Sequence, residues 1–397
     1  MPLNNAKNAK KISKCGESPL YLPQNLRNKM KVYIYENEFW PNFTWNDQEI
    51  IELLGKVRNL QGRIVGKMES LGFNLKQQAE LETLKTEILR SSEIEGEILN
   101  PEQVRSSIAR KLGMDISGLI PSDRNVEGIV DMMLDATQNF SKPLTKERLL
   151  DWHYALFPTG RSGMYKVIVG NWRNDSTGPM QVISGPMGKE KVHFQSPAAT
   201  RIEEEMNTFF DWFNNYEKID LVLKAGIAHL WFVTIHPFED GNGRIARTIS
   251  DMLLARADGI SQRFYSMSAQ IRQERKEYYE ILEKTQKGDL NITKWLTWFL
   301  NCLLNALNES NIILEKVISK HNFWIENALK IQNERQKLML NKILEGDFFG
   351  KLTSSKWAKI TKCSPDTALR DIQDLIDKGI LKKAEEGGRS TNYELIE

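Results

Sequence analysis

The chain has 397 residues, enough for two or three domains, and 41% of them are hydrophobic, so it can bury sizeable cores. The formal net charge is only +2, which gives no overall field to favour nucleic acid or an anionic membrane. The three cysteines, Cys15, Cys302 and Cys363, lie far apart and match no metal or redox spacing. No apolar run is long enough to span a membrane, and the basic N-terminus lacks the apolar segment of a secretory signal. We therefore expect reduced thiols and a cytoplasmic protein.

The N-terminal part of the sequence predicts a loose arm followed by a helical domain. Residues 1–30 are polar and basic, and we expect them to form the arm. Residues 33–45 are rich in aromatic side chains, a density that fits a ligand surface but is more common in a segment packed onto its own domain. Asn46 is expected to cap the first helix of a domain that covers residues 31–115.

A second helix of this domain ends in an acidic segment. The apolar stripe of this helix is formed by Leu81, Leu84 and Ile88. Asn100 and Pro101 are expected to end it, because proline cannot continue the ladder of helical hydrogen bonds. Another short helix is expected from Val104 to Leu112.

Residues 116–310 are expected to form a second, mainly helical domain. Thr145 is expected to cap one of its helices, which runs to about Leu156. The pattern then changes at two short strand-like runs, Val182-Ile183-Ser184 and Lys191-Val192-His193-Phe194, which a Gly- and Pro-rich link joins. We therefore expect a small β-hairpin within an otherwise helical domain.

Two further helices and a glycine-rich turn follow. The apolar run Leu223–Ile235 predicts a buried helix, which Pro237 ends because it lacks an N–H group. Gly241-Asn242-Gly243 is expected to form a loop, and Arg244–Ala257 resumes the apolar spacing of a helix. Helix, turn and second helix together form one compact motif.

The chemistry of this motif suits the binding of a polyphosphate. The turn leads into a helix N-terminus, which presents unpaired N–H groups and the positive end of the helix dipole. Arg244 and Arg247, one turn apart, add two cations. His236 titrates near neutral pH and could accept a proton from an attacking hydroxyl, and Asp240 is a hard oxygen donor suited to hold Mg²⁺ against phosphate oxygens. The plain alternative is a helical hairpin with a solvated charged face.

Residues His236 to Arg247 resemble the signature of Fic-domain proteins, HPFx(D/E)GNGRxxR, at every defined position. The resemblance implies an enzyme that transfers AMP from ATP to a hydroxyl of a target protein and releases pyrophosphate. It implies that His236 is the general base and Asp240 the Mg²⁺ ligand. It also implies that Gly241, Asn242 and Gly243 hold the α-phosphate, and that Arg244 and Arg247 hold the β- and γ-phosphates.

Residues Ser91 to Gly96 resemble the (S/T)xxxE(G/N) inhibitory motif of the same family. Ser91 and Glu95 lie one helical turn apart on the same face. A carboxylate there could pair bidentately with Arg247 in place of the γ-phosphate, and Gly96 would leave room for a close approach. We therefore expect inhibition within the same chain. Some family members use this glutamate to remove AMP, which gives Glu95 a second role.

The family resemblance also suggests where nucleotide and target lie. Tyr279 is expected to stack on or bond to the nucleotide, and Gln286 to line the same pocket, although both could simply pack or face water. The hairpin resembles the family's flap, whose free edge would align a target segment by strand addition. His193 on it could contact nucleotide or target, or face solvent. His229 and His153 are expected to be structural.

Residues 333–397 predict a separate unit that resembles a winged helix. Its two main helices are expected over Ser354–Ile360 and Ser364–Lys378, with a hairpin from Lys382 to Leu395. The second helix carries more acidic than basic residues, namely Asp366, Asp371, Asp374 and Asp377 against Arg370 and Lys378, so it is poorly suited to approach DNA phosphates. Three basic residues of the hairpin could compensate only in part: Lys382, Lys383 and Arg389. Protein docking or target selection is therefore at least as well supported as DNA binding. The preceding long helix is expected to end near Asn308.

The complete expected fold is mainly α: a Fic-type helical core with a β-hairpin flap, an N-terminal helical domain and a C-terminal winged helix. The main functional hypothesis is an autoinhibited protein adenylyltransferase with ATP and Mg²⁺, acting on a Ser, Thr or Tyr hydroxyl of a target protein or of itself. One alternative is a DNA-binding regulator whose Fic-like domain senses a nucleotide. Another keeps the enzyme but changes the nucleotide or diphosphate donor. The sequence also leaves open whether the protein forms a homo-oligomer.

Overall fold

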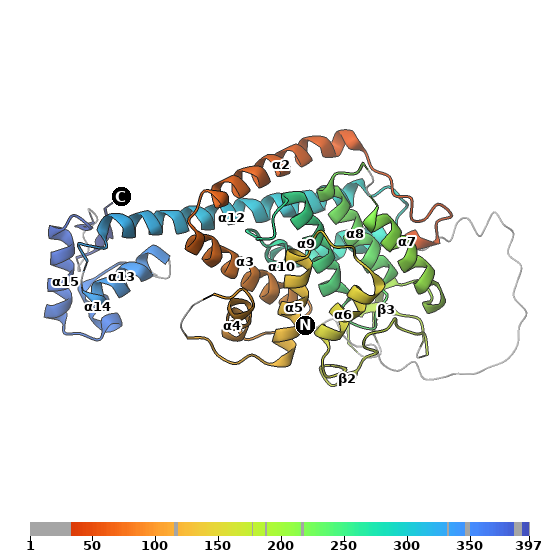
Figure 1. Ribbon diagram of the computed structural model, residues 1–397, viewed down its shortest axis with the longest axis horizontal. Coiled ribbons are helices and arrows are strands. Elements are labelled where there is room, and N and C mark those ends of the chain that lie inside the picture. The colour runs from red at the N-terminus through yellow and green to blue at the C-terminus, as the bar shows by residue number, and fades with distance from the viewer. Residues whose placement is uncertain are drawn as a thin grey trace, which may run out of the picture. The chain divides into compact units, whose positions relative to one another are not determined.

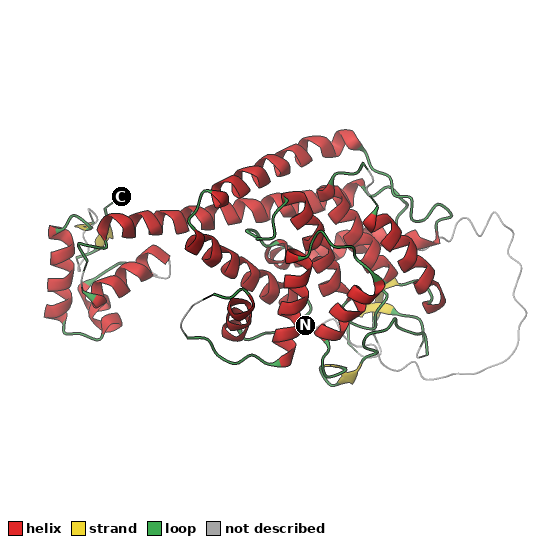
Figure 2. Ribbon diagram, viewed as in Figure 1, coloured by secondary structure: helices red, strands yellow, loops and turns green. Residues whose placement is uncertain are grey.

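The computed structural model describes residues 33–114, 118–176, 178–186, 189–215, 218–331, 333–345, 350–384 and 391–396. The expected basic arm over residues 1–30 lies outside this part of the chain. The chain divides into two compact units, Met1–Ser310 and Asn311–Glu397 (Figure 1). Helices dominate both units and the strands are short (Figure 2), which confirms the mainly helical prediction.

The first unit begins with a short turn and a group of helices. Its first elements are η1 (Ile34–Glu36), α2 (Asp47–Glu69), α3 (Phe73–Ile94), α4 (Pro101–Lys111), α5 (Arg124–Gln138) and α6 (Lys146–Leu156). The expected caps are confirmed, because the side chain of Asn46 accepts a hydrogen bond from the N–H of Gln48 and that of Thr145 accepts one from Arg148.

One expected helix end is wrong. Helix α3 already ends at Ile94, and Asn100 and Pro101 begin α4 instead. The side chain of Asn100 accepts hydrogen bonds from the N–H groups of Glu102 and Gln103, and Pro101 occupies the first helical position, where its missing N–H costs nothing. The segment between the two helices is therefore free to form the turn at Glu95 and Gly96 that is described below.

The rest of the first unit holds the β-hairpins and the central helices. Its elements are β1 (Arg161–Ser162), β2 (Tyr165–Lys166), β3 (Gln181–Ser184), β4 (Lys191–Gln195), η2 (Ala199–Arg201), α7 (Ile202–Asn214), α8 (Leu221–Ile235), α9 (Asn242–Asp258), α10 (Met267–Gln273), α11 (Arg275–Gln286) and α12 (Thr293–Asn327). Strands β1 and β2 pair antiparallel, as do β3 and β4. The β3–β4 hairpin, residues 181–195, is called the flap below.

Helix α8 is the centre of the first unit. Every residue from Val222 to Ile235 is buried, so this helix is surrounded on all sides, as its uninterrupted apolar sequence predicts. Helix α9 packs against it as the second half of a helical hairpin. The core thus fixes both halves of the motif that carries the predicted chemistry.

The aromatic segment over residues 33–45 packs onto the first unit. Tyr33 and Tyr35 make edge contacts with Phe194 of the flap. Trp40 and Phe43 make similar contacts with Trp231 of α8. Of the two expectations, packing is therefore what the structure supports.

Helix α12 is longer than expected, since it continues past Asn308 to Asn327. Its sequence contains neither glycine nor proline, and its apolar spacing continues beyond Asn308, so nothing stops the helix there. Across the described part of the chain, no helix combines the length and the apolar content needed to cross a membrane.

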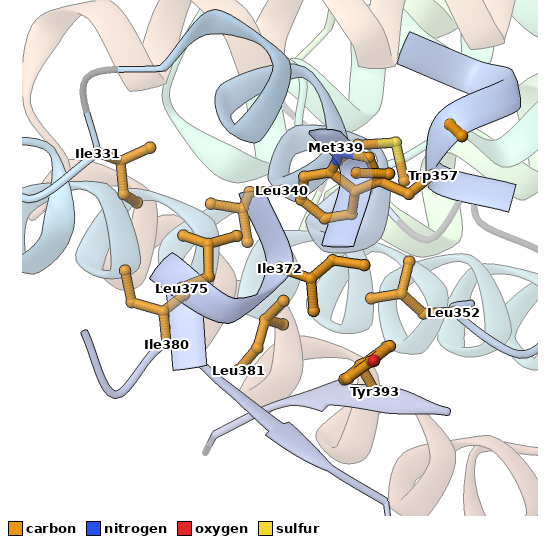
Figure 3. Close-up of a cluster of buried hydrophobic side chains, with 12 residues drawn as sticks. Ile331, Met339, Leu340, Leu352, Trp357, Ile372, Leu375, Ile380, Leu381 and Tyr393 are labelled. Carbon is orange, nitrogen blue, oxygen red and sulfur yellow. The ribbon is translucent and has the colours of Figure 1, made fainter. Parts of the chain in front are cut away.

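The second unit has three helices and a hairpin around a core of its own (Figure 3). Its elements are α13 (Glu334–Glu345), α14 (Ser354–Thr361), α15 (Pro365–Asp377), β5 (Leu381–Lys383) and β6 (Tyr393–Leu395). Trp357 is fully buried in this core, beside Ile372, Leu375 and Leu381. The expected contribution of Arg389 lies outside the described residues.

The acidic character of α15 differs from the expectation. Asp371 is buried and accepts hydrogen bonds from Arg335 and Asn333, so it faces α13 rather than solvent. Asp374 is bonded to Lys378 and Gln336. Sequence spacing counted both carboxylates as surface charge. Asp371 is instead buried beside Arg335, whereas Asp374 stays on the surface with 46% of its side chain exposed, so the exposed face of α15 is less acidic than its sequence by one carboxylate.

Candidate active site

The end of α8 holds His236 in an unusual backbone conformation. His236 caps this helix with φ 53° and ψ 58°, in the left-handed region that non-glycine residues rarely adopt. Its carbonyl oxygen accepts a hydrogen bond from Nε of Arg173 at 2.7 Å, and the carbonyl of Pro237 accepts one from the Arg173 backbone N–H at 2.9 Å. Arg173 therefore bonds this turn at two consecutive carbonyls.

The surroundings keep the imidazole of His236 neutral. Burial lowers its pKa to about 4, and the nearby Arg173 guanidinium acts in the same direction, while Asp240 and Glu95 oppose it. Nδ1 lies 3.2 Å from the carbonyl oxygen of Val233. Because a carbonyl can only accept, Nδ1 carries the proton and Nε2 is left as the free base.

The turn from Pro237 to Gly241 is held by the side chain of Asn242, the residue that follows it. Asn242 accepts a hydrogen bond from the N–H of Phe238 at 3.0 Å and donates to the carbonyl of the same residue at 2.8 Å. Gly241 has φ 83°, and a Cβ there would lie 2.9 Å from the ring of Phe157, so glycine is required twice over. The expected Gly241-Asn242-Gly243 loop is thus partly helix, because Asn242 and Gly243 already belong to α9.

His153 packs against this turn and forms a hydrogen bond to it, which is the structural role expected of it. Its ring stacks on Phe238 with centroids 4.0 Å apart. Nδ1 accepts a hydrogen bond from the N–H of Gly170, so Nε2 carries the proton and donates to the carbonyl of Asp240 at 3.2 Å. Burial lowers the pKa of His153 to about 4, which keeps it neutral in this position.

The N-terminus of α9 is the positive end of the site. The N–H groups of Asn242, Gly243 and Arg244 open this helix and have no carbonyl partner within it. Arg244 and Arg247 follow on the same helix, and both are buried. Nε of Arg244 and Nη1 of Arg247 are buried without a hydrogen-bond partner among the described residues. These donors form a site with the charge and direction needed for a polyphosphate.

The end of α3 closes this site with a carboxylate. Arg247 donates from Nε to Oγ of Ser91 and from Nη2 to the Ser91 carbonyl, both at 2.9 Å. Its Nη2 also donates to Oε1 of Glu95 at 2.9 Å. The pairing with Glu95 is therefore through one hydrogen bond and not bidentate as expected, and Nη1 of Arg247 keeps no partner among the described residues.

Glu95 lies directly against the first turn of α9. A Cβ added to Gly243 would lie only 2.1 Å from Oε1 of Glu95, so glycine is what lets the carboxylate come this close. Gly96 has φ 83° and turns the chain away immediately afterwards. Glu97, next in the chain, then accepts a hydrogen bond from Arg244 at 2.5 Å. Both arginines of the site are thus paired with residues from one short segment.

Asp240 points its carboxylate toward a second short segment. Oδ2 accepts a hydrogen bond from the hydroxyl of Ser162 on β1, and Oδ1 accepts one from the N–H of Gly241 at 2.6 Å. The side chain is half-buried. Within the described ranges, no group of three or more His, Cys, Asp or Glu side chains is arranged to hold a metal ion.

The two candidate nucleotide residues on α11 lie in different environments. Tyr279 lies with its ring centroid 5.0 Å from that of Tyr278, with the Arg275 guanidinium 5.2 Å from its centroid. Burial raises the pKa of Tyr279, so it stays a neutral donor. Gln286 is buried, and its amide donates to the end of α8, at the Val233 carbonyl and the Thr234 hydroxyl. His229, as expected, is internal, between Ser250 and Tyr278.

The flap forms as the sequence predicts, with a bulge. Val182 pairs with Phe194 and Ile183 with Val192, which leaves His193 in the bulge. The flap residues differ in exposure, since Val192 is exposed, Phe194 is buried, and Val182, Ile183, Ser184 and His193 are half-buried. His193 does not face solvent freely, because Nδ1 bonds Glu283 of α11 at 2.6 Å and Nε2 bonds Ser184 at 2.5 Å. The flap is therefore fastened to α11.

This geometry can be compared with known proteins. Residues 143–254 match the model of the Fic/DOC family. We call these residues the Fic/DOC region. Residues 33–114 match a domain of unknown function, DUF4172. Ser91, Glu95 and Gly96 thus lie in the DUF4172 match, and the residues His236 to Arg247 lie in the Fic/DOC region.

The chain is also similar in sequence to individual proteins that are named protein adenylyltransferases. Protein adenylyltransferase Fic of Nematostella vectensis is 37% identical over 98 residues, which are 24% of this chain and 21% of that protein. Protein adenylyltransferase fic-1 of Caenorhabditis briggsae is 29% identical over 199 residues, which are 50% of this chain and 36% of that protein. The chain thus spans about a fifth and about a third of the length of these relatives. A crystal structure of a Fic family protein from Desulfovibrio desulfuricans G20 covers 90% of this chain and 98% of its own at a TM-score of 0.52 and 19% identity, which shows a shared fold.

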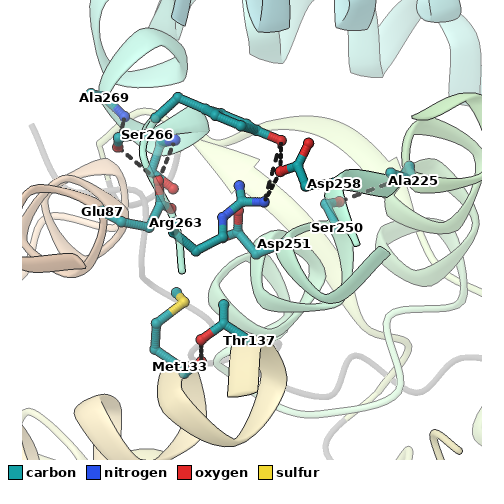
Figure 4. A network of polar contacts seen from close by, with 12 residues as sticks. Glu87, Met133, Thr137, Ala225, Ser250, Asp251, Asp258, Arg263, Ser266 and Ala269 are labelled. Atoms are coloured by element: carbon teal, nitrogen blue, oxygen red, sulfur yellow. Dashed lines mark hydrogen bonds and ion pairs between the residues drawn. The ribbon is translucent and has the colours of Figure 1, made fainter. Parts of the chain in front are cut away.

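A buried pair of carboxyl groups, Glu87 and Asp251, joins α3 to α9. Glu87 and Asp251 lie in one polar network with Arg263 (Figure 4), and Asp251 accepts from Arg263 at 2.8 Å. Oε1 of Glu87 and Oδ2 of Asp251 are buried without a partner among the described residues. Burial and the neighbouring Glu87 raise the pKa of Asp251 well above its ordinary value. A proton retained on Oδ2 of Asp251 and donated to Oε1 of Glu87 would satisfy both oxygens.

Glu87 also shows how α3 lies along α9. On α3, Glu87, Ser91 and Glu95 are four residues apart, and they meet Asp251, Arg247 and Gly243, which are four residues apart on α9. The contacts thus run along one face of each helix for two turns. Glu87 was not singled out from the sequence, although its place four residues before Ser91 was a usable signal.

The sequence alone also missed three other contacts in and around the Fic/DOC region. Ser162 lies on the two-residue strand β1 and Arg173 in a loop, and neither segment has a periodic pattern, so nothing local assigns them to the site. Glu97 follows Gly96 directly, and its charge could have been paired with Arg244. All three touch residues that the sequence had singled out, His236, Asp240 and Arg244.

Proposed function

We propose that this protein is an autoinhibited adenylyltransferase, which moves AMP from ATP to a Ser, Thr or Tyr hydroxyl of a target protein. The observation that carries the proposal is a neutral His236 beside an α9 N-terminus whose first N–H groups and two buried arginines suit a polyphosphate. The relatives named protein adenylyltransferase support the same activity. Pyrophosphate is the second product.

The residues of the site divide the reaction between them. Nε2 of His236 accepts the proton of the target hydroxyl, whose oxygen forms a bond to the α-phosphorus as the bond to pyrophosphate breaks. The N–H groups that open α9 stabilise the charge that develops on the α-phosphate oxygens. Arg244 and Arg247 hold the β- and γ-phosphates and neutralise the leaving group.

Asp240 suits the Mg²⁺ that such a nucleotide brings. Mg²⁺ is usually held by one or two carboxylates together with substrate phosphates, and the single half-buried carboxylate of Asp240 fits that pattern. When bound, the ion neutralises phosphate charge. The Ser162 hydroxyl and the Gly241 N–H hold the carboxylate in one orientation, while each oxygen keeps a free lone pair.

Inhibition follows from the position of Glu95. Its carboxylate occupies the anion-binding end of α9 and bonds Arg247, so a γ-phosphate must displace it or bind elsewhere. A triphosphate held elsewhere presents its α-phosphate out of line with His236. Glu95 is also a base within the site, which supports a second role in the removal of AMP by water.

The flap supports recognition of an extended target segment. Its two strands pair only with each other among the described residues, so each has an outer edge available for strand addition. A segment held there would place its hydroxyl before His236. Modification of the protein itself fits the same arrangement, with a second copy as the target.

For the second unit we propose a winged helix, on the basis of three helices followed by the β5–β6 hairpin. Because Asp371 and Asp374 are matched by neighbouring groups, the charge of α15 no longer argues strongly against DNA. Binding to random duplex at several salt concentrations decides the point. A steep loss of affinity with salt favours the DNA-binding regulator, and no binding favours protein docking.

The enzyme proposal is tested by transfer of label from α-labelled ATP with Mg²⁺ to the protein itself and to cell lysate. Wild type, Glu95→Gly, and Glu95→Gly with His236→Ala are compared. We expect strong labelling in the single variant alone. If no variant transfers label, the donor differs or the site binds nucleotide without catalysis, and the regulator hypothesis moves ahead.

A further inference from the structure

Arg173 lies between the catalytic turn and the root of the flap, and its side chain is completely buried. Every nitrogen of its guanidinium donates a hydrogen bond. Nε bonds the His236 carbonyl at 2.7 Å, and Nη1 bonds Asp175 at 2.8 Å. Nη2 bonds the Ser196 hydroxyl at 2.9 Å and the Pro197 carbonyl at 2.6 Å. A single side chain therefore connects two separate parts of the site.

On the catalytic side, these bonds oppose a strained backbone. His236 and Lys362 are the two non-glycine residues in the described ranges with positive φ. Residues other than glycine rarely adopt this left-handed conformation, because their Cβ comes too close to the following carbonyl oxygen. Arg173 bonds the carbonyls of both His236 and Pro237, the first through its side chain and the second through its backbone N–H. Without these bonds the turn can relax, and the imidazole moves with it.

On the flap side, Arg173 donates hydrogen bonds to the residues directly after β4. Ser196 follows Gln195, the last residue of β4, and both its N–H and its hydroxyl bond the Met180 carbonyl just before β3. Asp175, which pairs with Arg173, also accepts a hydrogen bond from the N–H of Ala199 at 2.7 Å. The guanidinium thus contacts the point where both flap strands leave the body of the unit.

We propose that Arg173 is a positioning residue that holds the His236 turn in its catalytic conformation and couples it to the root of the flap. A target segment that binds to the flap edge would then affect the position of His236, which accepts its proton, through Ser196 and Arg173. This inference rests on the proposed function for the word catalytic. The link between flap and His236 itself rests on the hydrogen bonds alone.

The test uses the full chain with Glu95→Gly as parent, so that transfer is measurable. Arg173→Met removes all side-chain bonds, Arg173→Lys keeps the charge but loses the fork, and Ser196→Ala removes one bond on the flap side. Arg148→Met is the matched control. Arg148 is only 12% exposed in its side chain, and it likewise bonds backbone carbonyls, at Lys142 and Pro143, away from the site. Melting temperature, kcat and KM for ATP are measured for each.

We expect kcat to fall by about 100-fold in Arg173→Met, with KM for ATP little changed, because misplacement of about 1 Å costs that much. Arg173→Lys should fall nearly as far, since the fork and not the charge fixes the turn. Guanidinium ion added to Arg173→Ala should restore part of kcat. Arg148→Met should lower the melting temperature and leave kcat per folded molecule unchanged.

A second readout does not depend on activity. Histidine-selective NMR labelling gives five imidazole signals, one for each histidine of the chain, and His236→Ala assigns the one of interest. The His236 signal should move in Arg173→Met and in Ser196→Ala, and stay in Arg148→Met. An unmoved signal with unchanged kcat overturns the role of Arg173, and Ser196→Ala decides it if Arg173→Met does not fold. If the parent transfers no AMP, the proposed function fails, while the NMR signal still reports on the link.

Discussion

Replacement of Glu95 by glycine should open the anion-binding end of α9 to ATP. The carboxylate competes with the γ-phosphate for Arg247, whose side chain is 2% exposed, whereas that of Glu95 is 29% exposed. A hydrogen bond between charged groups contributes about 1.5–3 kcal/mol, and partial exposure of Glu95 favours the lower end, about 1.5–2 kcal/mol. Since 1.4 kcal/mol is about tenfold, Glu95→Gly should bind ATP about 10- to 30-fold more tightly.

Calorimetric titration with a non-hydrolysable ATP analogue and Mg²⁺ measures this directly. Glu93→Gly is the matched control, because Glu93 lies two residues away and pairs with Arg90 and Arg272 rather than with Arg247. Its affinity should equal that of wild type. Equal affinity in wild type and Glu95→Gly would refute the reasoning, as would an equal gain in both variants.

Three further predictions concern the contacts around this site. Ser91→Ala removes one of the two hydrogen bonds that Arg247 donates to Ser91 and should raise nucleotide affinity less than Glu95→Gly, in the same titration; a larger gain would contradict it. Asn242→Ala leaves two buried backbone groups unpaired and should lower the free energy of unfolding by about 1–3 kcal/mol for each, measured with urea; an unchanged stability would show that the turn holds itself. Asp251 has a raised pKa in the folded protein, so its contribution to stability is present at low pH and lost as pH rises through that pKa. Asp251→Asn stays neutral, so its melting temperature should fall less than that of wild type as pH is raised above the ordinary aspartate pKa of about 3.9; an equal fall would mean that Asp251 does not retain its proton in the folded protein.

The sequence predicted the helices well where one strong local signal decided them. The apolar run before His236 became α8, and Asn46 and Thr145 cap the helices expected of them. The flap strands follow from short β-branched runs. Such features depend on neighbours in the chain, which is the information a single sequence contains.

The errors came from contacts between distant residues or from ambiguous breaks. Asn100 and Pro101 can end one helix or begin the next, and only packing chose the second. Asn242 looked like part of a loop, because its bonds to Phe238 arise only when the turn closes. The role of Arg173 could not be predicted, since its partners other than Asp175 lie 23 to 63 residues away in the chain. Asp371 counted as surface charge until Arg335 was seen beside it.

The central claim is that the site transfers the α-phosphate of ATP with His236 as the base. The most direct measurement compares Glu95→Gly protein incubated with ATP labelled at the α-phosphate and with ATP labelled at the γ-phosphate. The account predicts covalent label from the α-position, none from the γ-position, and loss of the α-label when His236→Ala is added. Label from the γ-position, or α-label that survives His236→Ala, would contradict it.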